Sequence, residues 1–168
     1  IVRAHRERTP WRAIILIPAT PGFPMEYDHP ESGSVRIISA LQYSSIARGP
    51  HSIFARLESV GIDPHAYIGF YSLRQWGRMR HGQLVTEQVY PHDKVMIVDD
   101  RLAIIGSANI NERSQRGDRD SELACVVQDH DVLMSRMAGE AFQVGRFPHT
   151  LRMRLMHEHV GWDVDAME

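Results

Sequence analysis

The chain has 168 residues, of which 43% are hydrophobic and 24% are charged, a composition typical of a globular domain. Its formal net charge of −2 lacks the positive excess that favours nucleic-acid binding. No apolar run is long enough to span a bilayer, and no secretory signal peptide is evident. The chain begins with Ile1 rather than Met, so we expect it to be a piece of a longer protein.

Apolar and helical patterns alternate along the first third of the chain. Residues 13–17 form a short apolar run that predicts a buried strand. Ser34 is a candidate N-cap of a helix that runs to about Ala47. Ser52 is a candidate N-cap of a second helix, which Gly61 ends.

The middle of the chain predicts a β-hairpin. Residues 66–73 are aromatic and apolar and predict a strand, whereas the polar and basic residues 75–82 predict a loop. Two apolar segments, 95–98 and 102–105, then flank the polar residues 99–101. Two short apolar runs around a polar turn are the pattern of a hairpin.

The remaining segments complete an α/β pattern. Residues 121–128 predict a strand, and residues 132–144 and 150–160 predict two helices. Cys125, the only cysteine, is expected to be a buried small side chain. The alternation of strands and helices predicts an α/β fold with a mixed β-sheet flanked by helices, as a single domain over residues 1–168.

Four polar residues lie at the open end of the predicted hairpin. His92 and Lys94 are two residues apart, so on a strand their side chains share a face. Ser107 and Asn109 share a face by the same count. If the second strand returns beside the first, its end brings Ser107 and Asn109 near His92 and Lys94.

These residue types suit a phosphodiester. A histidine attacks phosphorus or protonates a leaving oxygen, and a lysine ammonium offsets charge on the phosphate oxygens. A serine hydroxyl and an asparagine amide donate hydrogen bonds to the same oxygens. Nothing in the stretch requires a metal or another cofactor, and none is expected. The alternative interpretation is a hairpin whose polar ends are simply solvated.

The pattern His92-x-Lys94-x4-Asp99, followed by Gly106-Ser107-x-Asn109, resembles the HKD signature of the phospholipase D superfamily. The run from Asn109 to Ser114, continued by Gly117 to Glu122, resembles the second, C-terminal HKD motif of the eukaryotic-type enzymes. Shorter matches extend the resemblance over nearly the whole chain: Ala4-His5-Arg6-Glu7, Ile17-Pro18, Pro21-Gly22-Phe23, Gly145-Arg146-Phe147 and Leu151-Arg152. Pro91 departs from the pattern and donates no backbone hydrogen bond.

The resemblance implies a phospholipase D-like half-barrel or sandwich and a set of site residues. His92, Lys94 and Asp99 form the implied catalytic motif, and Lys94, Ser107 and Asn109 the implied phosphate-binding set. The opposite parity of Asp99 and His92 favours a structural, hydrogen-bonding role for Asp99. Glu122 matches the acidic residue that hydrogen-bonds a catalytic histidine and so orients it, the alternative being a solvated carboxylate.

Two groups of arginines have simpler interpretations. Arg113, Arg116 and Arg119 are expected to pair with Asp118 and Asp120, the alternative being contact with an anionic surface. Arg152 and Arg154 are expected to form a solvated face of the last helix. His157 and His159 point apart on a helix, so no metal is assigned to them.

The number of HKD motifs predicts half of an active site. In the superfamily one histidine attacks phosphorus and a second protonates the leaving alcohol, because one imidazole cannot do both at once. The only lysine of the chain is Lys94, so no second H-x-K exists here. The resemblance implies that His92 is the general acid and base, and that an N-terminal HKD half of the same enzyme supplies the nucleophile.

Three functions follow as alternatives. The first is a metal-independent phospholipase D that cleaves phosphatidylcholine-like lipids to phosphatidic acid and a head-group alcohol through a phosphohistidine, with transfer to other alcohols. The second is a single-HKD nuclease that completes its site as a homodimer, which the missing basic excess disfavours. The third is a non-catalytic half-site. The first implies a phospholipid substrate, no nucleic-acid partner, and a cytoplasmic enzyme peripherally associated with membranes.

Overall fold

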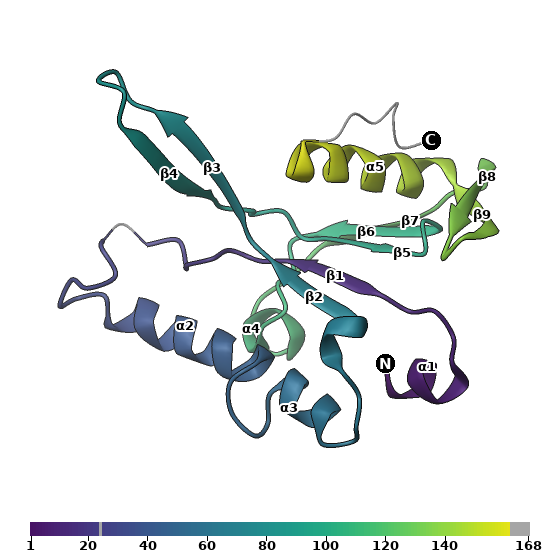
Figure 1. The fold of residues 1–168 in the computed structure, drawn as a ribbon, viewed down its shortest axis with the longest axis horizontal. Coiled ribbons are helices and arrows are strands. Elements are labelled where there is room, and N and C mark those ends of the chain that lie inside the picture. The colour runs from purple at the N-terminus through teal and green to yellow at the C-terminus, as the bar shows by residue number, and fades with distance from the viewer. Residues whose placement is uncertain (24, 162–168) are drawn as a thin grey trace. The chain divides into compact units, whose positions relative to one another are not determined.

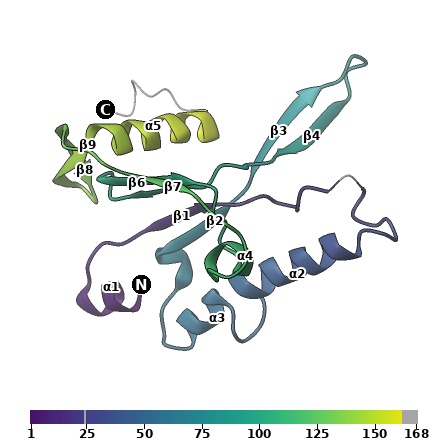
Figure 2. The ribbon, with the colours of Figure 1, turned by 180° about the vertical axis from the view of Figure 1, so that it is seen from behind.

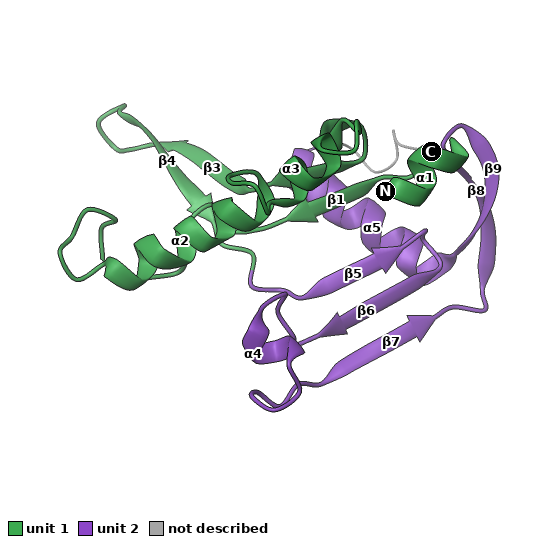
Figure 3. Ribbon diagram, turned by 90° about the horizontal axis from the view of Figure 1, so that it is seen from below, with its two compact units in different colours: residues 1–91 green, residues 92–168 purple. Residues whose placement is uncertain are grey.

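The computed structural model describes residues 1–23 and 25–161. The chain forms two compact units, Ile1–Pro91 and His92–Glu168, which Figure 3 distinguishes by colour. Helices and small sheets of both parallel and antiparallel strands build them (Figure 1), which confirms the predicted α/β class. No helix among the described residues is long and apolar enough to cross a membrane. The expectation of one domain within a longer enzyme stays a prediction.

The first unit pairs two parallel strands and carries three helices. Strands β1 (Ala13–Leu16) and β2 (Ile68–Tyr71) pair in register from Ala13 opposite Ile68. The helices and the short 3-10 turn are α1 (Val2–Glu7), α2 (Gly33–Ile46), α3 (Ile53–Glu58) and Pro64–Ala66. Ser52 caps α3 as predicted, because its hydroxyl accepts a hydrogen bond from the Ala55 N–H at 3.1 Å. The N-cap of α2 is Ser32 rather than Ser34.

A β-hairpin ends the first unit. Strands β3 (Leu73–Arg78) and β4 (Leu84–Val89) are antiparallel, with Arg78 opposite Leu84. The predicted loop over residues 75–82 is therefore wrong for 75–78, which belong to β3, and right for 79–82, which form the turn. Because both faces of this hairpin are solvated, polar residues such as Gln75 and Arg78 stand beside Trp76, and the regular apolar alternation that normally reveals a strand is missing from 75–78.

The second unit is built on a three-stranded antiparallel sheet. Its strands are β5 (Val95–Val98), β6 (Leu102–Gly106) and β7 (Ala124–Gln128), in the order β5-β6-β7. This confirms the predicted hairpin and the strand within residues 121–128. The side chain of Ala103 on the central strand is fully buried, whereas Cys125 is exposed, contrary to prediction.

A second hairpin replaces a predicted helix. Strands β8 (Val132–Met137) and β9 (Glu140–Gly145) occupy the segment for which the sequence predicts a helix over 132–144. Ala138 and Gly139 both have positive φ angles, 52° and 85°, which fit a tight hairpin turn between right-twisted strands. The exposure along β8 alternates with a period of two, the periodicity of a strand and not of a helix.

Helix α5 (Arg146–Val160) packs on the second unit and lies along one face of its sheet (Figures 1 and 2). It begins four residues before the predicted start, at Arg146. Pro148 occupies its first turn, where a missing N–H costs nothing, and the Phe147 N–H donates to the Asp129 carboxylate at 2.8 Å. Gly161, at φ 68°, ends the helix in the left-handed region.

Candidate active site at the open end of the β5–β6 hairpin

The predicted site residues lie in the second unit, and most of them lie at the open end of the β5–β6 hairpin. Strand β5 begins at Val95, so His92 and Lys94 precede it and are not strand residues. The Gly106 N–H donates to the Lys94 carbonyl at 3.0 Å. This bond holds the end of β6 beside Lys94, so the chain returns as the sequence predicts.

Gly106 brings β6 unusually close to the start of β7. A Cβ atom at Gly106 would lie 2.6 Å from the Leu123 carbonyl oxygen and 2.7 Å from the Ala124 Cβ, closer than real Cβ atoms approach. Immediately after it, the Ser107 N–H donates to the Leu123 carbonyl at 3.0 Å, and the Leu123 N–H donates to the Ser107 hydroxyl oxygen at 3.0 Å. The absence of a side chain at position 106 therefore lets Ser107 be held by two hydrogen bonds.

The Ser107 hydroxyl also contacts Glu122. It donates to the carboxylate at 2.5 Å, a short, charge-assisted bond. Hydrogen bonds from Ser107 and Ser114, together with the positive charge of Lys94, lower the pKa of Glu122, so this carboxyl group is ionised at neutral pH. A hydroxyl has a single proton, so Ser107 must release Glu122 before it donates to a phosphate oxygen.

Lys94 supplies the positive charge of the site. Its ammonium donates to the carbonyl oxygen of His92, which ties the backbone of the His92–Lys94 segment to the lysine side chain. An ammonium group has three protons, so two remain for phosphate oxygens. His92 is exposed, as a proton donor to an incoming substrate must be.

The short helix α4 (Glu112–Gln115) fixes the loop that links Asn109 to Glu122. The Gln115 side chain donates to the Asn109 carbonyl at 2.9 Å, and Asn111 caps the helix by accepting from the Ser114 N–H at 3.0 Å. Arg113 pairs with Asp120 at 2.9 Å, and the Asp120 N–H donates to the Arg113 carbonyl at 3.1 Å. The loop is thereby closed on itself, with Asn109 at one end.

Two of the three arginines of this loop, Arg113 and Arg116, pair with Asp120 and Asp118 as the sequence predicts, whereas Arg119 makes no ion pair with a described residue. Besides the Arg113 pair, Arg116 contacts Glu112 at 2.8 Å and Asp118 at 3.3 Å. These side chains are largely solvated, so the pairs contribute little to stability. Their use is to order the loop.

Asp99 lies away from these residues, in the turn at the other end of the hairpin. Asp99 and Asp100 have φ angles of 49° and 52°, and the Arg101 N–H donates to the Val98 carbonyl at 2.9 Å. Asp99 lies five residues after Lys94 along an extended strand, a separation of about 16 Å at roughly 3.3 Å per residue. The catalytic role of Asp99 stays a prediction. Its place in the turn does not favour direct contact with a substrate bound beside His92.

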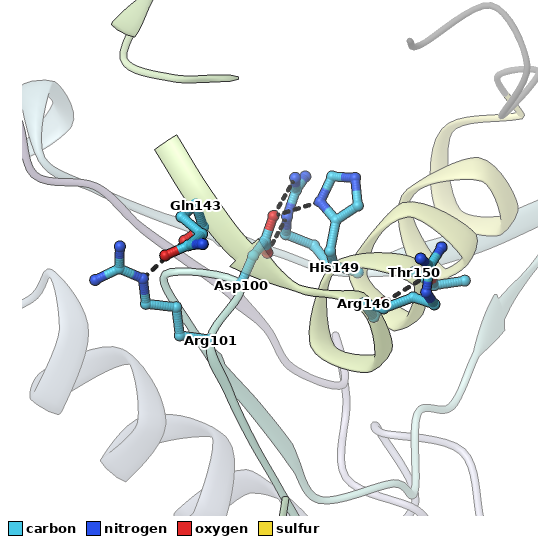
Figure 4. Close-up of polar contacts among 7 residues, drawn as sticks. Asp100, Arg101, Gln143, Arg146, His149 and Thr150 are labelled. Carbon is cyan, nitrogen blue, oxygen red and sulfur yellow. Dashed lines mark hydrogen bonds and ion pairs between the residues drawn. The ribbon is translucent and has the colours of Figure 1, made fainter. Parts of the chain in front are cut away.

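The neighbouring Asp100 is the buried carboxylate of the hairpin. Its side chain is 3% exposed and accepts from the His149 Nδ1 at 2.8 Å and from the Arg152 guanidinium at 2.6 and 2.7 Å. Figure 4 shows Asp100 facing His149 on α5. Its backbone carbonyl accepts from the Gly145 N–H at 2.8 Å. The prediction that Arg152 is part of a solvated face is therefore wrong.

Opposing effects act on the Asp100 carboxyl group. Burial raises its pKa, but hydrogen bonds from Arg152 and His149 and their positive charges lower it more, so the net shift is downward. The carboxylate thus stays charged within the unit and joins the hairpin turn to α5. Arg101 adds a second link, because its Nε donates to the Gln143 carbonyl of β9 at 2.8 Å (Figure 4).

Sequence reasoning missed Ser114 and the cluster of Asp100, His149 and Arg152. A signal for the cluster exists, since His149 and Arg152 are three residues apart and so share a helix face. Recognising it requires the helix to begin before residue 149, and the predicted start was Thr150. Within the described residues, no three histidine, cysteine or acidic side chains are grouped so that they could bind a metal ion.

The sequence of the chain is similar to known proteins. A family model described as phospholipase D matches residues 77–168. The chain is 52% identical to phospholipase D1 of Saccharomyces cerevisiae over 169 aligned residues, 46% identical to phospholipase D zeta 1 of Arabidopsis thaliana over 163, and 39% identical to human phospholipase D1 over 169.

These alignments cover 100%, 96% and 100% of the chain, but only 10%, 15% and 16% of the respective relatives. The chain therefore corresponds to a small part of each relative. The matched region of the family model includes all the candidate site residues, from His92 to Glu122.

Proposed function

The chain belongs to the phospholipase D family, and from this premise we propose that it is the C-terminal catalytic half of a phospholipase D. The reaction is hydrolysis of a phosphatidylcholine-like lipid to phosphatidic acid and a head-group alcohol. The observation that carries the proposal is the open end of the β5–β6 hairpin, where the Gly106–Lys94 bond places Ser107 and Glu122 beside a lysine that follows an exposed histidine.

The charges of this site suit a phosphodiester. Two protons of the Lys94 ammonium remain available to non-bridging oxygens, and the Asn109 amide lies at the end of the loop that α4 orders. The Ser107 hydroxyl joins them when it turns from the Glu122 carboxylate and donates its hydrogen bond to a phosphate oxygen instead. Because Glu122 is already ionised, it then serves as an acceptor for a protonated imidazole, which is the orienting role we propose for it.

The first chemical step forms a bond from a partner histidine nitrogen to phosphorus and breaks the bond from phosphorus to the head-group oxygen. His92, as imidazolium, gives its proton to that departing oxygen. In the second step neutral His92 takes a proton from water, whose oxygen attacks phosphorus and breaks the phosphorus–nitrogen bond. An acceptor alcohol in place of water gives transphosphatidylation.

The second histidine is proposed to come from an N-terminal HKD half of the same enzyme. The chain has one lysine and hence one H-x-K, and it corresponds to about a tenth to a sixth of the length of its relatives. The enzyme is further proposed to act in the cytoplasm at a membrane surface, where its lipid substrate is located.

Mixing the two halves tests the proposal. The purified chain alone should give no turnover of a choline lipid, whereas adding an N-terminal HKD half should restore choline release. The matched control is the same mixture with His92→Asn. A mixture that stays inactive although the halves bind each other would contradict the assigned reaction.

The alternatives are distinguished in the same assay. Turnover by the chain alone that rises with dimer content in light scattering would support a homodimeric site instead. Cleavage of single-stranded DNA in preference to the lipid would favour a nuclease. Activity from a strictly monomeric sample would contradict the half-site mechanism altogether.

A further inference from the structure

The β3–β4 hairpin of the first unit, residues 73–89, has an unusual surface. Figures 1 and 2 show it extending away from the β1–β2 sheet. Its base is attached to the preceding loop by Gln88, which makes three hydrogen bonds with Thr20 at 2.7–3.3 Å. Its outer part carries large apolar side chains in contact with solvent, namely Trp76 (73% exposed), Leu84 (63%) and Met79 (56%).

The strand register places Trp76 and Leu84 on one face together with arginines, whereas Met79 lies just beyond the end of β3. Directly opposite residues of antiparallel strands share a face, so Arg78 lies beside Leu84, and Trp76 lies beside Thr86. Arg74 and Arg78 are two residues either side of Trp76 and therefore share its face. We call this surface, formed by Arg74, Trp76, Arg78, Leu84 and Thr86, the Trp76 face.

Charge is segregated between the two faces. Glu87 is the only acidic residue of the hairpin, and its register partner is Gln75, so it lies on the face opposite Trp76. Arg80 lies in the turn between the strands, which the Met79 N–H closes by donating to the Gln83 carbonyl at 2.8 Å. The hairpin is thus basic, with three arginines against one glutamate, within a chain of net charge −2.

We propose that the Trp76 face is a docking surface for an anionic phospholipid bilayer. A tryptophan with an apolar ring and a polar N–H partitions to the membrane–water interface, and Leu84 and Met79 add apolar area at the same end of the hairpin. The arginines complement the negative head groups, which attract basic residues close to the surface. This inference concerns binding alone and does not depend on the proposed reaction.

Two properties separate a bilayer from other occupants. A nucleic acid needs the arginines but gains little from Leu84 and Met79 at the end of a hairpin, since its affinity rests mainly on phosphate neutralisation. A protein interface is also enriched in tryptophan, methionine and arginine, but it has no need of anionic lipid, so the dependence of vesicle binding on anionic lipid and on salt distinguishes a bilayer from a protein partner. The combination of exposed interfacial aromatic and aliphatic groups with arginines on one face fits the head-group region of a bilayer.

Vesicle co-sedimentation of the whole 168-residue chain tests the proposal. The probes are vesicles of phosphatidylcholine alone and of phosphatidylcholine mixed with phosphatidylserine. Phosphatidylserine supplies the negative charge that the proposal requires, and it is not the proposed substrate. Binding should be stronger to the mixed vesicles and should weaken as salt is added. Equal binding to both, or none to either, would overturn the proposal.

Matched variants locate the surface. Trp76→Ala should weaken binding to the mixed vesicles by about tenfold or more, whereas Trp76→Phe should keep most of it. Trp11→Ala is the control, because Trp11 is 45% exposed but lies outside the hairpin. Equal losses in Trp76→Ala and Trp11→Ala would overturn the assignment, provided circular dichroism shows both variants folded.

The charge contribution has its own pair of variants. Arg78→Gln with Arg80→Gln should weaken binding by roughly 25-fold at low salt, at about fivefold per arginine near the surface. Arg3→Gln with Arg6→Gln, exposed positions on α1, should change it little. Tighter binding of single-stranded DNA than of the mixed vesicles, lost in the hairpin pair but kept in Trp76→Ala, would assign the surface to nucleic acid instead.

Discussion

The two ends of the β5–β6 hairpin contain the same kinds of group in opposite environments. At the open end, Glu122 is exposed and lies near Lys94, and His92 is exposed as well. At the turn end, Asp100 is buried and is contacted by His149 and Arg152. By inspection alone the turn end, with its histidine–carboxylate pair, is the more typical catalytic arrangement.

The difference lies in how many hydrogen-bonding positions remain for a substrate. Both Asp100 oxygens accept bonds from Arg152, His149 adds another, and the side chain is 3% exposed, so nothing can approach it. Lys94 keeps unused protons, and the open end faces solvent. A saturated, buried cluster joins elements of the fold, whereas an unsaturated, exposed one is available for chemistry.

The largest expected effect is on turnover at the open end. In the assembled enzyme, His92→Asn and Lys94→Ala should each lower kcat/KM by about 100- to 1,000-fold, through loss of proton transfer and of phosphate stabilisation respectively. A diester with a very good leaving group needs no proton, so it should rescue the first step of His92→Asn more than that of Lys94→Ala. Equal rescue of both variants would contradict the role given to His92.

Next in size is a stability effect at the turn end. Asp100→Asn should lower the free energy of unfolding by about 2 kcal/mol, because Arg152 and His149 lose their buried partner. The control is the adjacent Asp99→Asn, which should change stability by less than about 0.5 kcal/mol at an exposed position. Urea unfolding of the two variants measures the difference, and similar values would remove the distinction between the two aspartates.

The same cluster should make stability depend on acid pH. Because the pKa of Asp100 is lowered in the folded chain, its contribution is complete above the ordinary carboxyl pKa of 3.8 and is lost as the pH falls from there through the lowered value. Asp100→Asn removes this carboxyl group, so unfolding free energy measured against pH should fall less steeply at acid pH in the variant. Parallel curves for the two proteins would show that other carboxyl groups carry the dependence.

The smallest predicted effect concerns Ser114. Ser114→Ala removes one of the two serine hydrogen bonds that lower the pKa of Glu122, so that pKa should rise toward its ordinary value without reaching it. NMR titration of the Glu122 carboxyl carbon measures the shift, with Ser121→Ala as a control at the adjacent residue. In the assembled enzyme we expect at most a few-fold change in kcat. An unchanged pKa would mean that Ser107 alone holds Glu122.

The sequence allowed the open end of the hairpin to be predicted but not the turn end. Ser107 and Lys94 were predicted to meet because two apolar runs around a polar turn determine a register, and the register determines the neighbours. The Asp100 cluster joins residues 49 and 52 positions apart, so it depends on where α5 begins and on how that helix packs. The hydrophobic periodicity of a single segment reveals neither the first residue of α5 nor the way in which that helix packs.

The two mistaken segments failed for a shared reason. Residues 132–144 contain apolar side chains at both helical and strand spacings, and the deciding feature was the pair Ala138-Gly139, whose positive φ angles make a turn. Residues 75–78, the strand part of the predicted loop, lack a regular apolar alternation because both sides of their strand meet water. In each case a turn glycine, Gly139 or Gly82, gave better information than hydrophobicity.

The contact made by Gly106 has a consequence for how this site would appear in a screen of random substitutions. Any side chain at position 106 collides with the Leu123 carbonyl oxygen and with the Cα and Cβ atoms of Ala124. Backbone atoms and a methyl side chain cannot move aside as the end of a long, flexible side chain can. Every substitution there should displace Ser107 and reduce turnover as severely as changes to the chemical groups themselves. A survey that ranks positions by lost activity would therefore count a residue with no functional group among the most sensitive of the enzyme.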